Sequence, residues 1–407
     1  MPGTTDTGTG ARIATNRRLR GMTQVQLANK ANVSYSLLTK VEAGIKPASA
    51  ALTAACARAM DMPVTALNGQ PFSVEHFHDN LDGPLAELRA ALDNWDMPLE
   101  EVPVRTMSEI RADIDRLVKV RRGASFGQIA QWAPALINEL VQFSQTLTGE
   151  HARRAHHMLV QVYRSAHDVA YGLGLTDLAS LLMTRMDYSA SRSGDLFLMS
   201  LYRYMRAQST FSTGRHEVGR KIIDIARDEI AAEVAAGHPA ALCAAGNLNL
   251  RAAILSTRQG DGPAAREALK EARKLAEMLG DVEVEGGLAD GHHLMSFGPT
   301  NVAIHASAVE LELGQHGKAL ALAKKVTFPE GFPPDRVGHH WIDTARAQLW
   351  TGKTDDALAS LMRAKKAAPQ QAKYHPSVRE TVAGLVRAAR STPDTLIGYA
   401  HWVGVQP

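Results

Sequence analysis

The sequence predicts an all-α protein with a small N-terminal helical domain and a longer array of helical hairpins. Ala, Leu and Arg, which favour helices, are frequent, whereas aromatic residues make up only 5% of the 407 residues. No sustained alternation of Val, Ile, Thr and Tyr competes with this pattern, although a half-buried strand needs such alternation. A chain of this length can bury more than one core, so we expect two or three domains.

Helix-capping residues divide the first 70 residues into short helices. A Thr- and Gly-rich stretch over residues 1–10 is expected to be a disordered tail. A first helix over residues 11–20 should end at Gly21, since glycine is a favoured residue just after a helix. Thr23 and, three residues later, Gln26 form a capping-box pattern, which predicts a second helix running to about residue 30.

The next helices complete a compact N-terminal domain over residues 11–69. A third helix is predicted to begin after its cap, Ser34, and to end at Gly44, because Pro47 prevents it from resuming. A fourth helix is expected over residues 48–60, and a fifth, short one follows Pro63. Their apolar residues can form one core, which comprises Ile13, Leu27, Ala28, Val33, Leu38, Val41, Leu52 and Leu67.

The charge of this region indicates a polyanionic partner. The whole chain has a formal net charge of +3. Residues 1–70 alone carry eight basic and three acidic side chains, so this region has a formal charge of +5 and the rest has −2. Such an asymmetry is typical of proteins that bind nucleic acid, and a solvated basic surface without a partner is the alternative.

The stretch "MTQVQLANKANVS", followed by "LLTKVEAGIKPAS", resembles the lambda-repressor-like, Cro/C1-type (XRE family) helix-turn-helix domain over about 60 residues. The resemblance implies that the helix after Ser34 enters the major groove of double-stranded DNA while the preceding helix braces against the backbone. Gln24 would contact a phosphate or clamp a side chain of the recognition helix. The other residues expected at DNA are Ser34, Tyr35, Ser36, Thr39 and Lys40, with Arg17, Arg18, Arg20 and Lys46 at phosphates.

The expected reading residues limit how specifically one domain can read DNA. Neither Arg nor Asn stands among them, so bidentate recognition of guanine or adenine is not available. We therefore expect DNA shape and the spacing of two half-sites to supply much of the specificity. Three alternatives stay open: a retained interaction module without DNA binding, cations that are only solvated, and Tyr35 packed against the fourth helix.

Residues 70–106 are expected to form a linker and a connecting helix, and the helices that follow belong to a repeat region over residues 107–407. Amphipathic helices are predicted over residues 108–122 and 128–147. Beyond them, short turns recur around five glycines, which are Gly174, Gly214, Gly260, Gly314 and Gly352.

Small residues at fixed distances from these turns predict antiparallel helix pairs. The residues five positions after the glycines are Ala179, Gly219, Ala265, Ala319 and Ala357. The pattern is similar to the tetratricopeptide (TPR) repeat, which implies a solenoid with a concave face. About six hairpins fit residues 150–390. Residues 281–305 interrupt the array as an insertion that either contributes to the binding face or only connects.

The combination of both regions resembles the Cro/C1-type TPR regulators of actinobacteria and the peptide-sensing regulators of Gram-positive bacteria. In the latter, asparagines of the concave face hold the peptide backbone. The resemblance implies a peptide or small-molecule ligand on that face, with a structural hydrogen bond as the alternative role for each candidate residue. The candidates stand on helices that precede turn glycines and are Tyr163, Arg203, Asn247, Asn249 and Asn301.

Most motifs for catalysis, cofactor binding and metal binding are absent from the sequence. It contains no GxxxxGK[ST], HExxH, CxxC or GxGxxG. One GxSxG, GASFG over residues 123–127, lies between two predicted helices and does not follow a strand, so we expect neither an enzyme nor a cofactor. Adjacent histidines on a helix point about 100° apart, so the pairs at 156–157, 292–293 and 339–340 do not predict a metal site. Two isolated cysteines provide no disulfide framework, and no apolar run reaches the roughly 18 residues of a membrane span.

These observations predict a cytoplasmic, nucleoid-associated transcription regulator. Residues 11–69 would bind DNA, and residues 107–407 would form a homodimer and sense the signal. A ligand would change the spacing of the two DNA-binding domains. It can do so only if it binds one arrangement of the two domains more tightly than the other. The alternatives are a DNA-tethered adaptor whose solenoid binds a protein partner, and an enzyme with an unrecognised site in the solenoid.

Overall fold

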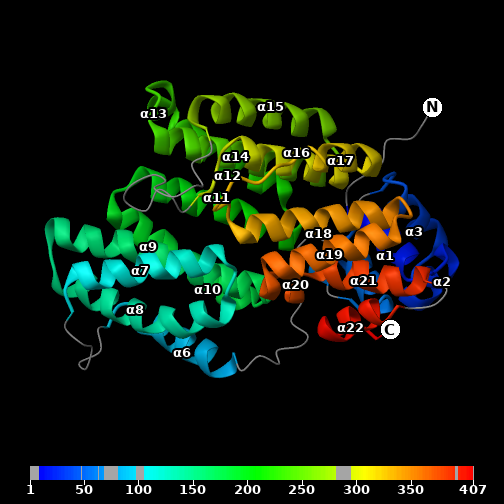
Figure 1. The fold of residues 1–407 in the computed structure, drawn as a ribbon, viewed down its shortest axis with the longest axis horizontal. Helices are drawn as coiled ribbons and strands as arrows, with labels where there is room; N and C mark the ends of the chain where they lie inside the picture. Colours follow the sequence, from blue (N-terminus) through cyan, green and yellow to red (C-terminus); the bar gives the residue numbers. More distant parts are fainter. Residues whose placement is uncertain are drawn as a thin grey trace.

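A computed structural model of the chain describes residues 9–46, 48–62, 64–67, 81–97, 105–280, 295–389 and 393–406. These ranges contain α-helices and no strand, so the all-α prediction is confirmed. An N-terminal helix-turn-helix bundle is followed by helical repeats (Figure 1). Within the described ranges, no helix is long and apolar enough to span a membrane.

Five helices form the N-terminal bundle, which we call the head. They are α1 (Thr9–Leu19), α2 (Gln24–Ala31), α3 (Tyr35–Glu42), α4 (Ala50–Ala59) and α5 (Val64–Leu67). The capping box expected before α2 is present, because Thr23 Oγ1 accepts from the Gln26 amide and Gln26 Oε1 accepts from the Thr23 amide. Ser34 caps α3 in the same way by accepting from the Leu37 amide. Local capping thus fixes where the two central helices begin.

The head encloses the apolar core that the sequence predicts. Seven of the eight expected core residues are buried, and the eighth, Val33, packs against them while partly buried. Helix α1 begins two residues before the expected position, so Gly10 is not part of a tail. A Cβ atom on Gly10 would lie 1.9 Å from the carbonyl oxygen of Val41, so the missing side chain lets α1 approach α3. Residues 1–8 of the expected tail lie outside the described residues.

Three helices connect the head to the repeats. Helix α6 (Asp82–Asp93) is the connecting helix, and it packs against α8 (Phe126–Thr146). Helix α7 (Met107–Arg122) begins with a second capping box, formed by Thr106 and Glu109. The predicted helices at 108–122 and 128–147 are therefore confirmed, each starting one or two residues early.

The repeats are antiparallel helical hairpins whose turns contain the predicted glycines. All five turn glycines have φ between 68° and 79°, the left-handed region that glycine adopts without strain. All five small residues that follow the turns are buried, which lets the paired helices approach. In the described ranges the hairpins are α9 (Gly149–Gly172) with α10 (Thr176–Ser193), α11 (Leu196–Thr213) with α12 (His216–Glu229), α14 (Pro239–Arg258) with α15 (Gly262–Leu279), α16 (Pro299–Glu312) with α17 (His316–Ala323), and α18 (Pro334–Trp350) with α19 (Thr354–Ala367).

The remaining helices are shorter than a full repeat. Helix α13 (Ala231–Ala235) follows α12, and the chain ends in α20 (Pro369–Tyr374), α21 (Pro376–Ala388) and α22 (Asp394–Trp402). Where the sequence predicts about six hairpins, the described ranges therefore contain five with a glycine turn, followed by these short helices. Residues 281–294 of the expected insertion lie outside the described residues.

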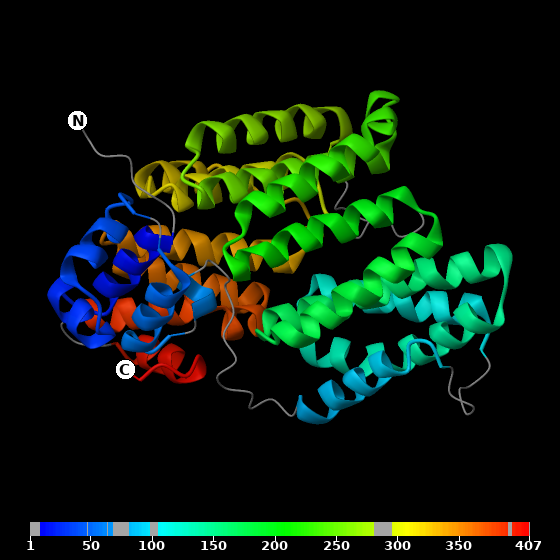
Figure 2. The ribbon, with the colours of Figure 1, turned by 180° about the vertical axis from the view of Figure 1, so that it is seen from behind.

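The array curves until its two ends meet. At this junction the Gly127 amide donates to Gln370 Oε1 at 3.2 Å, and the rings of Phe126 and Tyr374 stack with their centres 6.4 Å apart. The head lies beside the C-terminal helices in both views (Figures 1 and 2), with α1 against α21 and α5 against α11. The curved repeats and the head together surround the inner side of the solenoid.

Candidate functional site

Helix α3 presents a polar surface to solvent. Leu38 and Val41 anchor its inner side in the core of the head. Ser34, Ser36 and Lys40 are exposed, and Tyr35 is 51% exposed. The structure thus brings the expected reading residues together on one face.

Two hydroxyls on this face already make local hydrogen bonds. Ser34 Oγ accepts from the Leu37 amide at 3.2 Å, and the Thr39 hydroxyl donates to the carbonyl of Tyr35 at 3.0 Å. The Ser34 hydroxyl proton remains available as a donor, whereas Thr39 can offer only its oxygen lone pairs. Thr39 is also less exposed than Ser36 and Lys40. It is therefore the weaker candidate for a donor contact with DNA.

A buried network joins α3 to the first two helices. Arg17 donates to both carboxylate oxygens of Glu42, at 2.7 and 2.8 Å, and Gln24 Nε2 donates to Glu42 Oε2 at 2.8 Å. A third donor of Arg17 reaches the Met22 carbonyl at 2.7 Å. Of the two roles expected for Gln24, its position fits the clamp on the recognition helix. The network holds α3 at a fixed angle to α1 and α2.

Two cations expected at phosphates make contacts within the protein, Arg17 while buried and Arg20 while partly buried. Arg17 is buried in the network with Glu42, and the Arg20 guanidinium donates to the Met60 carbonyl at 2.8 Å. Burial lowers the pKa of Arg20, and the nearby Glu380 partly compensates. In contrast, Arg18 and Lys46 are exposed. We therefore keep Arg18 and Lys46 as phosphate candidates and omit Arg17 and Arg20, whose side chains face the wrong way.

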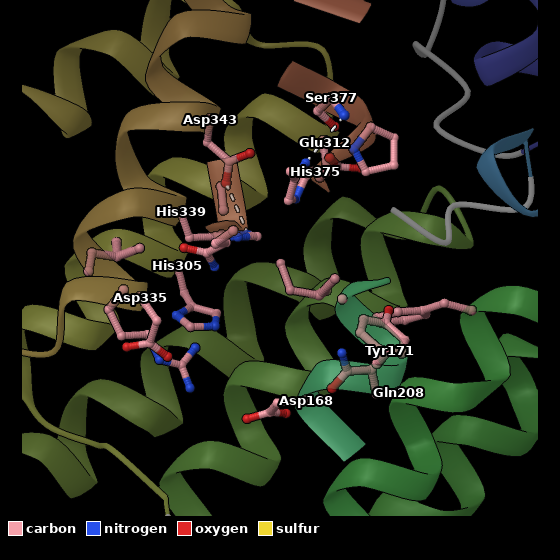
Figure 3. Close-up of a pocket in the computed structure, with 18 of the residues that line it drawn as sticks. Asp168, Tyr171, Gln208, His305, Glu312, Asp335, His339, Asp343, His375 and Ser377 are labelled. Atoms are coloured by element: carbon pink, nitrogen blue, oxygen red, sulfur yellow. Dashed lines mark hydrogen bonds and ion pairs between the residues drawn. The ribbon is translucent and has the colours of Figure 1, made fainter. Parts of the chain in front are cut away.

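A cavity of about 310 Å³ lies on the inner side of the solenoid. The first helix of every hairpin contributes to its wall, together with residues of α1, α7, α8, α20 and α21. Figure 3 shows part of this wall, with labelled residues of α9, α11, α16, α18 and α21. The wall contains the residue six positions before each turn glycine, namely Asp168, Gln208, Ile254, Ala308 and Arg346. These offsets are the sequence signal that could have identified the cavity.

Three of the predicted ligand residues stand on the correct helices but point elsewhere. Tyr163, Arg203 and Asn249 each lie eleven positions before a turn glycine, five from the wall position. Five residues turn a helix by about 140° beyond a full rotation, which directs these side chains away from the cavity. Arg203 pairs with Glu229 at 2.5 Å, and Asn249 Oδ1 accepts from Arg227 at 2.5 Å.

Asn247 and Asn301 also make structural contacts. Each lies seven residues before a wall position, on nearly the same side of its helix. The segment at 295–298 covers this end of the helices, with Asn301 Nδ2 donating to the Ser296 carbonyl at 2.9 Å. Asn247 donates to the Cys243 carbonyl at 3.0 Å. None of the five predicted ligand residues is among those that line the cavity in the described structure.

Ion pairs occupy much of the cavity wall. Asp168 contacts both Arg121 and Arg164, and Glu312 contacts Arg258 at 3.1 Å and Arg346 at 3.1 Å. Burial raises the pKa of Glu312, but the two arginines outweigh burial and bring it to about 2. These carboxylates are therefore ionised at neutral pH and hold neighbouring helices together.

Two of the three histidine pairs, at 156–157 and 339–340, lie in the described residues. Within the described ranges no group of three or more His, Cys, Asp or Glu side chains is arranged to hold a metal ion. His156 is buried beside Ser189, and burial, helped by Arg192, lowers its pKa to about 4. The pair at 292–293 lies outside the described residues.

The head is similar to a known protein family. Residues 13–67 match the protein family described as Helix-turn-helix. No curated protein matches the chain. Solved structures with some similarity include PlcR of Bacillus thuringiensis in complex with the peptide PapR7 and DNA, at 16% identity over 67% of this chain and 95% of that chain, with a TM-score of 0.28. Apo ComR of Streptococcus vestibularis is 13% identical over 90% and 93%, with a TM-score of 0.21.

Proposed function

We propose that the chain is a DNA-binding transcription regulator, and not an enzyme, that acts in the cytoplasm on nucleoid DNA. Residues 11–69 bind double-stranded DNA, residues 70–106 connect, and residues 107–407 dimerise and sense a signal. The observation that carries the proposal is the match of residues 13–67 to the helix-turn-helix family, combined with the exposed polar face of α3. Two heads of a homodimer would bind half-sites about one turn of DNA apart.

The exposed residues of α3 suit a contact with the major groove. Lys40 and the hydroxyls of Ser34 and Ser36 can bind phosphates or acceptor groups on base edges. Tyr35 adds an exposed ring that can pack against a thymine methyl group or the sugar backbone. The buried network of Arg17, Glu42 and Gln24 supports this role because it fixes the angle at which α3 leaves the head.

The cavity is the proposed sensor site for a peptide or a small molecule. Arg12, Thr15 and Asn16 of α1 contribute to its wall, so a bound ligand would contact the head as well as the repeats. A ligand that binds more tightly in one head position than in another shifts the population towards that position. The site is thus placed to transmit occupancy to the DNA-binding surface.

The adaptor alternative is less well supported. A protein partner on the concave face needs an open groove, whereas the contacts of Gly127 with Gln370 and of Phe126 with Tyr374 join the two ends of the array. A cavity of about 310 Å³ lies at the lower end of the range of roughly 300–1,000 Å³ for small-molecule sites. We therefore favour a small ligand.

Selection of genomic DNA fragments tests the proposed function. The purified chain should retain a reproducible set of fragments that share a pair of related half-sites, and a cell extract should change the retained set or its yield. A variant with Tyr35→Ala, Ser36→Ala and Lys40→Ala should lose the selection while unfolding at the same temperature. Random retention by the original chain, or the same selection by the variant, would contradict the proposal.

A further inference from the structure

The wall of the cavity carries more cationic than anionic side chains. Among the described residues that line it, arginines outnumber carboxylates seven to five. The arginines are Arg12, Arg121, Arg164, Arg251, Arg258, Arg336 and Arg346, and the carboxylates are Asp168, Glu312, Asp335, Asp343 and Glu380. Burial also raises the pKa of Glu380, which weakens the anionic side further.

Asp168 and Glu312 of the wall each contact two arginines. Asp168 contacts Arg121 and Arg164, so two positive charges meet one negative charge. Glu312 contacts Arg258 and Arg346, and only Arg346 has a second carboxylate, Asp343, at 3.1 Å. The pairs inside the wall therefore neutralise one another without using up the positive excess.

Arg251 on α14 is an arginine of the wall for which the described structure contains no ion pair. Within the described structure no carboxylate contacts it, and its buried Nε has no hydrogen-bond partner. Its Nη2 donates to the neutral amide of Gln208 at 2.9 Å, and its guanidinium lies 4.2 Å from the ring centre of Tyr204. The guanidinium carbon also lies 5.6 Å from the ring centre of Phe211. The guanidinium is thus held in place on an aromatic support while one of its donors stays unused.

The titration of Tyr204 reports the same positive potential. Burial alone raises the pKa of a tyrosine, yet the pKa of Tyr204 is lowered, because Arg251, Arg336 and Arg164 favour the phenolate more than burial opposes it. A cavity wall with such a potential favours anions over neutral or cationic molecules. The aromatic rings beside it offer an apolar surface to the rest of a ligand.

We propose that the cavity binds a small organic carboxylate, with Arg251 as the residue that holds the carboxylate and Tyr171 and Phe211 packing against its apolar part. Arg suits this task because its planar guanidinium donates two parallel hydrogen bonds to a carboxylate. Both a free organic acid and the C-terminal carboxylate of a short peptide present this group. This proposal names the class of ligand for the proposed sensor site. Only the role of that ligand as a signal rests on the proposed function.

Paired probes that differ only in charge test the proposal on the full chain. Calorimetry with phenylacetate and phenylacetamide addresses a free acid, and a tripeptide ending in phenylalanine, with a free or an amidated C-terminus, addresses a peptide. Each carboxylate should bind at least about tenfold more tightly than its amide, because a hydrogen bond to a charged group contributes roughly 1.5–3 kcal/mol and tenfold corresponds to about 1.4 kcal/mol. If phenylacetate binds more tightly than the peptide, the ligand is a free organic acid. If the peptide with a free C-terminus binds more tightly, the ligand is a peptide.

Variants locate the binding to Arg251. Arg251→Gln should weaken carboxylate binding by about tenfold or more and leave amide binding unchanged. Arg273→Gln, which alters an exposed arginine on the outer helix α15, is the matched control and should have no effect. A third variant does not depend on removing Arg251: Gln208→Glu places a carboxylate beside it, which should raise the unfolding temperature of the empty protein and abolish the preference for carboxylates.

The outcomes separate this inference from the proposed function. Equal binding of acids and amides, no binding of either carboxylate, or undiminished carboxylate binding by both variants would overturn the carboxylate site. In those cases, DNA selection by the same protein preparation still tests independently whether the chain is a DNA-binding regulator. Carboxylate binding without DNA selection would instead support the site and contradict the regulator.

Discussion

Glu42, at the end of α3, joins three helices of the head, and its replacement by Ala tests whether this network sets the orientation of the recognition surface. Its side chain is 3% exposed and accepts two hydrogen bonds from Arg17 and one from Gln24. The Arg17 side chain is itself 8% exposed. Glu42→Ala therefore leaves a positive charge inside the head with no counter-ion.

The magnitude follows from that uncompensated charge. Removing one partner of a buried ion pair costs about 3–5 kcal/mol. A domain of about 60 residues has a total stability of roughly 3–9 kcal/mol, so the loss is a large part of what keeps the head folded. The repeats have separate cores, so they should remain folded. We expect a chain whose solenoid is intact and whose head opens.

Hydrogen exchange measured by mass spectrometry on the full chain resolves the two parts. Peptides from α1 to α3 should lose protection in Glu42→Ala, whereas peptides from α9 and α10 should not. Glu217→Ala is the control, because Glu217 and its partner Lys221 are 76% and 72% exposed and such pairs contribute no more than about 1 kcal/mol. The double variant Arg17→Met with Glu42→Met should regain much of the protection. Unchanged exchange in α1 to α3 of Glu42→Ala would refute the reasoning.

Three further predictions concern packing and pH. Gly246→Ala should lower the free energy of unfolding by about 1–3 kcal/mol in denaturant titrations, because the new Cβ would lie 2.0 Å from the Phe297 ring. The control Gly317→Ala should be neutral or stabilising, because a Cβ there would have no atom within 4 Å. Gly10→Ala should reduce exchange protection of α1 and α3, since the atom it approaches is the Val41 backbone carbonyl, and full protection would contradict the close packing described. His156, with a pKa of about 4 in the folded chain against 6.5 for the free side chain, contributes stability that is complete above pH 6.5 and is lost as the pH falls towards 4. His156→Gln should flatten this part of the stability profile, and an unchanged profile would show that His156 is not the group involved.

The head and the turns of the repeats could be predicted from the sequence because their signals are local. Thr23 with Gln26 and Ser34 with its following turn act within three residues. Each turn glycine needs only its own backbone conformation. The core of the head follows from spacing along helices that these residues delimit. Such features depend little on the rest of the chain.

The placement of charged residues could not be predicted in the same way. From the sequence, Arg17 is predicted to be a surface cation beside Arg18. Only the fold shows that Arg17 pairs with Glu42, which lies 25 residues later. The cavity depends on how all the hairpins curve together, which decides the side of each first helix that faces inward. Asn247 and Asn301 are nearly on that side, but the segment at 295–298 covers them. Tertiary contacts from distant residues thus decide these sites.

The central claim is that the exposed face of α3 binds DNA, and the affinity for a selected fragment measured across a series of salt concentrations tests it most directly. Lys40→Met should weaken binding and reduce the slope of log affinity against log salt by about one, since one phosphate contact is lost. The triple variant Tyr35→Ala, Ser36→Ala and Lys40→Ala should lose about 100-fold or more in affinity, at roughly 1–3 kcal/mol for each base contact. Its exchange protection should match that of the original chain. Equal affinity and an equal salt slope in these folded variants would contradict the account.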